Sequence, residues 1–167
     1  MADFDTAVTL VLRQEDSTLS GVVTHTKGDH GGATRFGISV AAYAALADGP
    51  FYTTMSTSDA LQTATKIYRS DYWNKIQGDN LQSQDLANCL LSFAVVSGPS
   101  TALRTLQHSL NLTEDGVMGP HTLAAANGAD CVDSCKTAIC DHYRQIALND
   151  PTQQRFLQGW LNRVSLS

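Results

Sequence analysis

The sequence carries little charge and has no excess of positive charge. Lys and Arg number 11 against 16 Asp and Glu, which gives a formal net charge of −5 at pH 7. An acidic chain lacks the electrostatic attraction that draws basic proteins to nucleic acids and anionic membrane surfaces. We therefore expect no nucleic-acid partner and a recognition site whose chemistry is local.

Long apolar runs are also lacking. The segment Met1–Asp5 has no basic stretch, and the apolar run near it is shorter than a signal peptide or a transmembrane helix requires. We expect no membrane insertion, and transport across a membrane would depend on another component. The sequence shows no repeat, no low-complexity tract and no long linker. A hydrophobic content of 43% in 167 residues is sufficient for one core, and we expect a monomer.

Only four cysteines occur, and three of them lie within Cys131–Cys140. Structural zinc sites typically use matched pairs of ligands, which this cluster and His142 do not provide. Cys135 falls on an apolar helical stripe, so a buried thiol is favoured, while a disulfide stays open. His25 and His30 lack a ligand set and are typical of surface histidines. We expect no metal and no cofactor.

Hydrophobic periodicity predicts a mainly α-helical fold with a small β-hairpin. A cap at Asp3 or Asp5 precedes a helix that ends at Glu15, and Val22–Thr24 indicates a hairpin strand. The remaining helices are expected at about 39–47 (capped by Ser39), 58–73, 83–97, 99–110, 121–127, 130–148 and 151–164. A soft boundary near Gly78 divides the chain into residues 1–78 and a helical lobe, residues 79–167, packed together as one unit.

The most informative pattern pairs Glu15 with the glycine-rich segment that runs from Asp29 to Ile38. Cleavage of a glycosidic bond needs a carboxyl group that donates a proton and a second oxygen-bearing group that handles water or the developing positive charge. Glu15, Asp29 and Thr34 offer these groups, and the intervening glycines permit the chain reversal that would bring them together. The same residues would also serve as a helix end, a turn cap and a structural Thr, so spacing alone leaves both interpretations open.

The order of these motifs resembles glycoside hydrolase family 108, the phage and bacterial N-acetylmuramidases, over nearly the whole chain. The helix-end Glu15 is followed by Asp29-His-Gly31-Gly32-Ala-Thr34-Arg-Phe-Gly37-Ile38, which is similar to the family pattern Asp-x-Gly-Gly-x-Thr-x-x-Gly-Ile. Three later segments also resemble the family and the predicted peptidoglycan-binding region that accompanies it: Tyr68–Trp73, Leu106–Leu123 and Arg155–Arg163.

The resemblance implies a lysozyme-like fold, with residues 1–78 as a catalytic muramidase lobe and residues 79–167 as a peptidoglycan-binding lobe. It implies hydrolysis of the β-1,4 bond between N-acetylmuramic acid and N-acetylglucosamine in bacterial peptidoglycan, as in an endolysin. Glu15 would be the general acid, and Asp29 and Thr34 would position water. Such a protein is expected to be made in the bacterial cytoplasm and to reach the periplasmic wall through a holin or a secretion system.

Candidate substrate-binding residues come from the same motifs. Aromatic rings cover the apolar faces of sugars, although at helical spacing they are equally typical of a core. The candidates are Gly31, Gly32, Arg35, Tyr72 and Trp73.

Two departures from the family pattern keep other functions open. Asp16 and Ser17 stand where glycines usually follow the Glu, and Ser92 and Val96 stand where the family carries an Asp and an Asn. One alternative is a lytic transglycosylase, in which the substrate's own 6-hydroxyl attacks and Asp29 is not needed. Another is a peptidoglycan-binding module that has lost catalysis.

Overall fold

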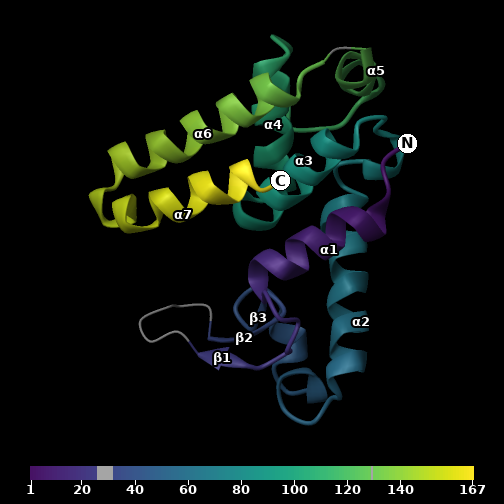
Figure 1. Ribbon diagram of the computed structural model, residues 1–167, viewed down its shortest axis with the longest axis vertical. Coiled ribbons are helices and arrows are strands. Elements are labelled where there is room, and N and C mark those ends of the chain that lie inside the picture. The colour runs from purple at the N-terminus through teal and green to yellow at the C-terminus, as the bar shows by residue number, and fades with distance from the viewer. Residues whose placement is uncertain (26–31, 129) are drawn as a thin grey trace.

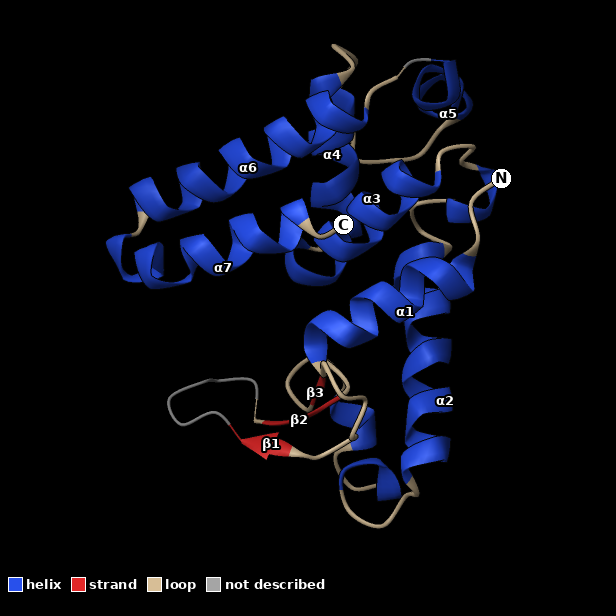
Figure 2. Ribbon diagram, viewed as in Figure 1, coloured by secondary structure: helices blue, strands red, loops and turns tan. Residues whose placement is uncertain are grey.

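The computed structural model describes residues 1–25, 32–128 and 130–167. As the sequence predicts, these residues are mainly helical and include a small antiparallel sheet (Figure 2). The helices are α1 (Phe4–Glu15), α2 (Thr57–Ile67), α3 (Gln84–Ser97), α4 (Pro99–Ser109), α5 (Pro120–Gly128), α6 (Val132–Asn149) and α7 (Gln154–Ser165). The strands are β1 (Thr24–His25), β2 (Ala33–Arg35) and β3 (Ile38–Ser39).

The helix boundaries follow local capping chemistry. The Asp3 side chain accepts a hydrogen bond from the Thr6 amide at 2.8 Å, and Ser83 accepts one from the Leu86 amide at 3.2 Å. Such bonds satisfy amide groups that have no partner within a helix's first turn. Gly98 (φ +86°) ends α3, and proline at the next position begins α4, which confirms the predicted break between the helices at 83–97 and 99–110.

Helix α3 is the centre of the core. Leu86, Leu90 and Leu91 are fully buried, and α3 packs against α1, α4, α6 and α7. Helices α6 and α7 lie side by side, so that α7 returns the chain toward α1 and α3 (Figure 1). The predicted apolar stripe of α6 is confirmed, with Cys135 and Ile139 fully buried. The first and last helices therefore meet on the same side of the core.

The sheet lies beyond the end of α1, in the order β1-β2-β3 (Figure 1). Thr34 of β2 pairs with Thr24 on one side and with Ser39 on the other. Phe36 and Gly37, which join β2 to β3, both have positive φ (49° and 77°), as the tightest hairpin turns require. The prediction of a hairpin is confirmed, although its first strand begins at Thr24 rather than at Val22.

The prediction of a helix capped by Ser39 is wrong. Ser39 is the last residue of β3, and its hydroxyl accepts a hydrogen bond from the Ala42 amide at 3.3 Å in a turn. Only short 3-10 turns follow, at Ala44–Leu46 and Pro50–Tyr52. Pairing with β2 buries Ile38 and holds this segment extended, so the local capping signal is overridden by tertiary contacts.

The predicted helix over residues 58–73 is confirmed with a change of winding near its end. It begins after a cap at Ser56 as α2 and continues as a π-helix over Tyr68–Trp73. The wider winding places Trp73 in the core, where it is fully buried and its ring meets Phe4 at a centroid distance of 5.5 Å. The Trp73 indole nitrogen donates to the Asp79 carboxylate at 2.9 Å.

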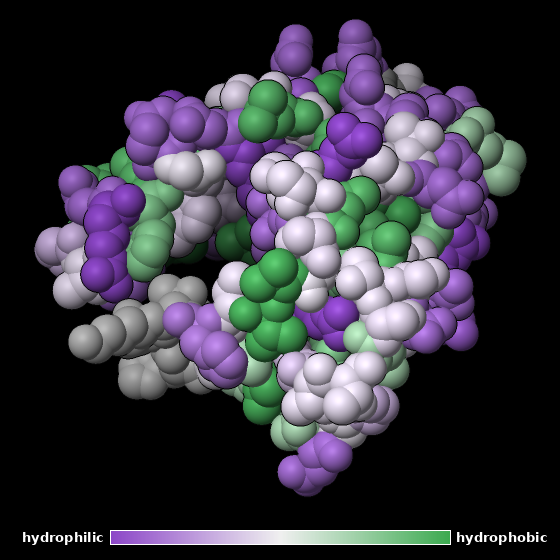
Figure 3. Space-filling model, turned by 60° about the horizontal axis from the view of Figure 1, so that its bottom comes forward, coloured by the Kyte–Doolittle hydropathy of each residue, from purple (hydrophilic) through white to green (hydrophobic). Residues whose placement is uncertain are grey.

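Figure 3 shows a hollowed face on which hydrophilic and hydrophobic residues are interspersed. Over the described parts of the chain, no helix combines the length and the apolar character needed to cross a membrane.

The contact between Trp73 and Gly78 generates a stability prediction. A Cβ atom added at Gly78 would overlap the Trp73 indole, whereas one added at Gly159 in α7 would meet no atom within 4 Å. We expect Gly78→Ala to lower the free energy of unfolding by roughly 2–4 kcal/mol, because the ring has no free space to move into. Gly159→Ala, the control, should be neutral or raise stability by up to about 1 kcal/mol. Urea denaturation of both variants tests this; equal stabilities would contradict the assigned packing.

Candidate active site

Glu15 is the last residue of α1 and stands at the edge of the core. Residues Phe4, Ala7, Val8, Val11 and Leu12 bury the inner face of the helix. The backbone becomes extended at Asp16 (φ −144°, ψ 94°), so the Glu15 side chain lies where α1 ends and the chain continues toward the sheet. The position of this carboxyl group is therefore determined by the packing of the whole helix.

The hairpin turn lies directly against this acid. A Cβ atom at Gly37 would come within 2.6 Å of Glu15 Cγ, which explains why a residue without a side chain stands there. The buried Tyr68 hydroxyl donates to the Phe36 carbonyl at 2.9 Å and anchors the same turn. Burial, with the charge of Glu15 as a smaller cause, raises the pKa of Tyr68, so this hydroxyl remains a donor.

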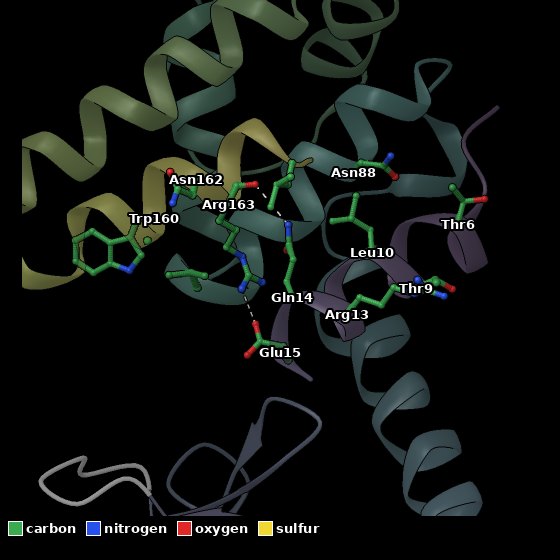
Figure 4. A pocket seen from close by; sticks show the side chains of 13 residues that line it. Thr6, Thr9, Leu10, Arg13, Gln14, Glu15, Asn88, Trp160, Asn162 and Arg163 are labelled. Atoms are coloured by element: carbon green, nitrogen blue, oxygen red, sulfur yellow. Dashed lines mark hydrogen bonds and ion pairs between the residues drawn. The ribbon is translucent and has the colours of Figure 1, made fainter. Parts of the chain in front are cut away.

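A guanidinium from the other end of the chain holds the Glu15 carboxylate. Arg163 Nη1 of α7 donates to Glu15 Oε1 at 2.7 Å, and the two side chains are 15% and 23% exposed, respectively (Figure 4). Partial removal from water strengthens such a pair relative to one on the surface. Arg163 thus fixes one oxygen of the candidate acid.

Arg163 is itself held by a short network. Its Nε donates to Ser92 Oγ at 3.0 Å, Ser92 Oγ donates to Gln14 Oε1 at 2.7 Å, and Gln14 Nε2 donates to the Arg163 carbonyl at 3.4 Å. Its Nη2 is buried and has no hydrogen-bond partner among the described residues. The serine at position 92 therefore orients the guanidinium, and α1, α3 and α7 together build the site.

Sequence reasoning did not assign a role to Arg163. The residue lies 148 positions from Glu15, and no local pattern joins them. Its position on α7 did indicate a special role, because Arg163 lies between Trp160 and Val164, which both face the core. A charged side chain at such a position requires a partner, because an unpaired buried charge is costly.

Two hollows meet at Glu15. The first, of about 290 Å³, lies toward the sheet and is lined by Glu15, Asp16, Ser17, Ser20, Val22, Thr24, Thr34, Phe36 and Gly37. The second, of about 880 Å³, lies among α1, α3 and α7 and includes Leu10, Arg13, Val96 and Trp160 (Figure 4). Among the described residues Glu15 alone lines both, so a long ligand lying across them would pass over its carboxyl group.

The structure brings Glu15 and Thr34 to one hollow, as their shared motif predicts. Asp29 and Gly31 lie outside the described residues. Gly32 has a positive φ of 71°, and the nearest atom to a Cβ at this position would be Val40 Cβ at 3.6 Å. Of the three predicted catalytic residues, two are therefore placed.

Asp16 is bound to the loop that follows it. Its carboxylate accepts hydrogen bonds from the Gly21 amide at 2.7 Å and the Ser20 hydroxyl at 3.0 Å. Burial acts to raise the pKa of Asp16, but the hydrogen bonds from Gly21, Ser20 and Thr18 outweigh it and lower the pKa. This second carboxylate beside Glu15 shapes the loop in place of the glycines of the family pattern.

Two predicted substrate-binding residues are structural instead. The Arg35 side chain is buried and donates to the carbonyls of Gly21 (2.8 Å), Phe51 (2.7 Å) and Met55 (3.0 Å). Trp73 is fully buried and offers no face to a sugar. Both predictions assumed that a motif residue is exposed, whereas tertiary packing buries its side chain.

Tyr72 is half-buried, and its hydroxyl oxygen lies 3.5 Å from that of Tyr43. Tyr72 is not among the residues that line the two hollows.

Within the described ranges no group of three or more His, Cys, Asp or Glu side chains is placed to hold a metal ion. His25 is exposed in β1, and His30 lies outside the described residues. The four cysteines are free thiols, and Cys89, Cys131 and Cys135 are buried.

The arrangement of a mainly helical body, a small sheet and an acid at the end of the first helix defines a lysozyme-like fold. The sequence profile of the family described as Glycosyl hydrolase 108 matches residues 10–98, and that described as Predicted Peptidoglycan domain matches residues 101–165. The solved structure of Brucella abortus SagA is similar, with a TM-score of 0.74 and 33% sequence identity over 97% of this chain and 89% of that chain. A search of curated proteins found no match.

This chain belongs to glycosyl hydrolase family 108. It is a glycoside hydrolase, and the second matched domain supports activity on peptidoglycan. The two matched regions meet at the Gly98–Pro99 corner between α3 and α4. The division at residue 78 stays a prediction.

The ion pair generates a prediction about activity. Arg163→Met removes the hydrogen bond to Glu15 but keeps an unbranched apolar stem, which ends where the guanidinium group of Arg begins. We expect the rate of peptidoglycan hydrolysis at saturating substrate to fall about 10- to 100-fold, because the acid loses its fixed orientation.

The control is Arg155→Met, because Arg155 is exposed on the same helix and lies over the Phe156 ring. Circular dichroism should show that both variants fold. Activity of Arg163→Met within twofold of the wild type would refute the positioning role.

Proposed function

We propose that this protein is an N-acetylmuramidase that hydrolyses the β-1,4 bond between N-acetylmuramic acid and N-acetylglucosamine, with Glu15 as the general acid. The observation that carries the proposal is the position of the Glu15 carboxyl group at the meeting point of two hollows. A glycan strand lying across both would present a glycosidic oxygen to this group.

The two oxygens of Glu15 take different roles in this proposal. Oε1 accepts from Arg163, whereas Oε2 has no hydrogen-bond partner among the described residues. Oε2 is therefore the atom that would carry the proton and transfer it to the leaving oxygen as the bond to C1 breaks.

Water completes the reaction. Its oxygen would bond to C1, and its proton would pass to the Asp29 carboxylate, while Thr34, in the same hollow as Glu15, hydrogen-bonds the water. The assignment of Asp29 rests on the family motif that contains it.

One observation favours a second candidate, a lytic transglycosylase. Of the carboxylates that line the described part of the smaller hollow, Asp16 is bound by its loop, which leaves Glu15 as the available acid. A transglycosylase needs one such acid, because the 6-hydroxyl of the muramic acid attacks C1 in place of water.

The proposed role of Glu15 is tested by Glu15→Gln. The amide oxygen can still accept from Arg163, so we expect a nearly unchanged thermal transition together with a loss of activity of at least about 100-fold. Asp5→Asn, an exposed change on the same helix, is the control and should leave both properties unchanged. A Glu15→Gln variant that keeps substantial turnover would exclude Glu15 as the acid.

Mass spectrometry of the products distinguishes the two reactions. For a muramidase, digestion of purified peptidoglycan should yield fragments with reducing N-acetylmuramic acid ends, and Thr34→Val should slow their release. Fragments with 1,6-anhydro ends, each lighter by one water, would establish a transglycosylase. Binding without released fragments would indicate a module that has lost catalysis.

We also propose separate roles for the two predicted parts of the chain and a way for the protein to reach the cell wall. Residues 1–78 would carry the catalytic groups and residues 79–167 would bind the wall, with Arg163 as a contribution of the second part to the first. Peptidoglycan lies outside the cytoplasmic membrane, so the protein would reach it through a holin, as an endolysin does, or through a secretion system.

A further inference from the structure

The larger hollow extends from Glu15 back along α1, away from the sheet. Thr6, Thr9, Leu10 and Arg13 line it at helical spacing, so one face of α1 forms a wall of the hollow. Thr6 precedes Glu15 by nine residues, which corresponds to roughly 13 Å at the rise of an α-helix. The hollow is therefore longer than one sugar ring and extends beyond the groups at the bond that would break.

The position of Thr34 gives a bound strand a direction across Glu15. In the proposed hydrolysis the water that Thr34 holds attacks C1, so the sugar that contains C1 lies in the smaller hollow, beside the sheet. The leaving sugar carries the oxygen that Glu15 protonates, and it lies on the other side of the acid, in the larger hollow. The part of the strand toward its reducing end would thus follow α1.

Arg13 is a cation of the larger hollow that has no partner among the described residues. The other charged residues that line this hollow, Glu15 and Arg163, pair with each other. Arg13 is exposed, and its side chain makes no ion pair with the described chain. Figure 4 shows it on α1 between Glu15 and Thr6. Its guanidinium group is therefore available to a carboxylate of a ligand.

A second free group faces the same hollow from α3. Asn88 is only 8% exposed, and its Oδ1 accepts from Gln84 Nε2 at 2.8 Å, whereas its Nδ2 makes no hydrogen bond to the described chain. Nδ2 is not sealed in the core, because within the described ranges Arg163 Nη2 alone is both fully buried and unpartnered. A nearly buried amide that keeps one donor toward the hollow suits an acceptor such as an N-acetyl carbonyl.

The free cation selects among the groups of a glycan strand. Carboxylates occur on muramic acid, either on its own lactyl group or on the peptide attached to that group, whereas N-acetylglucosamine carries none. The leaving sugar of a muramidase is N-acetylglucosamine. The first carboxylate on this side of Glu15 therefore belongs to the muramic acid that follows the leaving sugar.

We propose that Arg13 is a specificity-determining residue, which pairs with the carboxylate of the first muramic acid beyond the leaving sugar while the reducing-end part of the strand lies along α1. The direction of the strand rests on the proposed function. The affinity of the larger hollow for a muramic acid carboxylate does not require catalysis.

The first test compares two soluble substrates that differ only beyond the leaving sugar. A trisaccharide of N-acetylglucosamine, N-acetylmuramic acid and N-acetylglucosamine ends at the leaving sugar, and the tetrasaccharide adds one muramic acid at the reducing end. We expect Arg13→Gln to lower the ratio of kcat/KM for the tetrasaccharide to that for the trisaccharide about fivefold, mainly through KM, which is the upper end for an exposed ion pair. An unchanged ratio would overturn the proposal.

Two further variants separate the charge of Arg13 from its contribution to the helix. Arg13 lies in the last turn of α1, where a cation also stabilises the helix. Arg13→Lys keeps the charge and should retain part of the preference for the tetrasaccharide. Arg155→Gln makes the same change of charge on α7 outside the hollow, and its ratio should equal that of the wild type. A ratio that falls equally in Arg13→Gln and Arg155→Gln would contradict a specific contact.

The same pair of substrates with stem peptides attached distinguishes the two sources of the carboxylate. In these substrates the lactyl group is bound in an amide, so the free carboxylates belong to the peptide. A ratio that falls in Arg13→Gln for the peptide-free pair alone assigns the contact to the lactyl group, and a fall for the peptide-bearing pair alone assigns it to the stem.

Binding of an uncleavable disaccharide tests the site without catalysis. N-acetylglucosaminyl-N-acetylmuramic acid lacks the bond that a muramidase cuts, and its titration into isotope-labelled protein should shift the amide resonances of Thr9, Arg13 and Asn88 in a saturable manner. Arg13→Gln should weaken this binding, whereas the uncharged disaccharide of N-acetylglucosamine should bind both proteins equally.

Failure of this proposal is distinguishable from failure of the proposed function. If the wild type cleaved neither oligosaccharide, the proposed function would fail, while the titration would still decide the binding site. Equal affinities of wild type and Arg13→Gln for the muramic acid disaccharide, or shifts confined to the smaller hollow, would contradict the role of Arg13.

Discussion

The ion pair between Glu15 and Arg163 is the contact on which the candidate active site depends. It joins the last residue of α1 to α7 beside Ser92 of α3, so the packing of three helices determines where one carboxyl group lies. A partly buried pair of this kind need not add to the free energy of unfolding, because desolvation offsets much of the attraction. Its effect is geometric. It holds Oε1 and leaves Oε2 without a hydrogen-bond partner among the described residues.

The network behind Arg163 fixes the direction of its guanidinium group. Ser92 accepts from Nε, but the buried Nη2 has no partner among the described residues. On the sheet side, Gly37 and Tyr68 confine the same carboxyl group by contact and by anchoring the turn. The acid is therefore constrained from both sides.

Local chemistry predicted most of the fold. Asp3 and Ser83 start helices because their side chains meet free amides nearby, and Gly98 with the following proline stops one helix and starts the next. These signals lie within a few residues of their effects. The prediction at Ser39 was wrong because pairing with β2 holds its segment in the sheet, and a pattern of neighbouring residues does not reveal strand pairing.

The site was less accessible to prediction for the same reason. Glu15 and Thr34 belong to one motif and do meet in one hollow. Arg35 belongs to that motif as well, yet its side chain turns inward to carbonyls of Phe51 and Met55, which are distant in sequence. Trp73 lies in a segment that is wound as a π-helix instead of the α-helix that the sequence predicts. Its ring is therefore buried in the core. Motif membership thus locates a region, while side-chain direction depends on contacts between distant segments.

The sequence separation of the ion pair has a consequence for synthesis. Glu15 leaves the ribosome 148 residues before its partner does, so this contact cannot form until the chain has been extended through Arg163. Helix α1 packs mainly on α3, which follows it by about 70 residues, and the carboxyl group gains its orientation only when α7 also folds back toward both helices. A chain truncated before α7 would therefore carry Glu15 and Thr34 without the contact that holds the Glu15 carboxyl group in place.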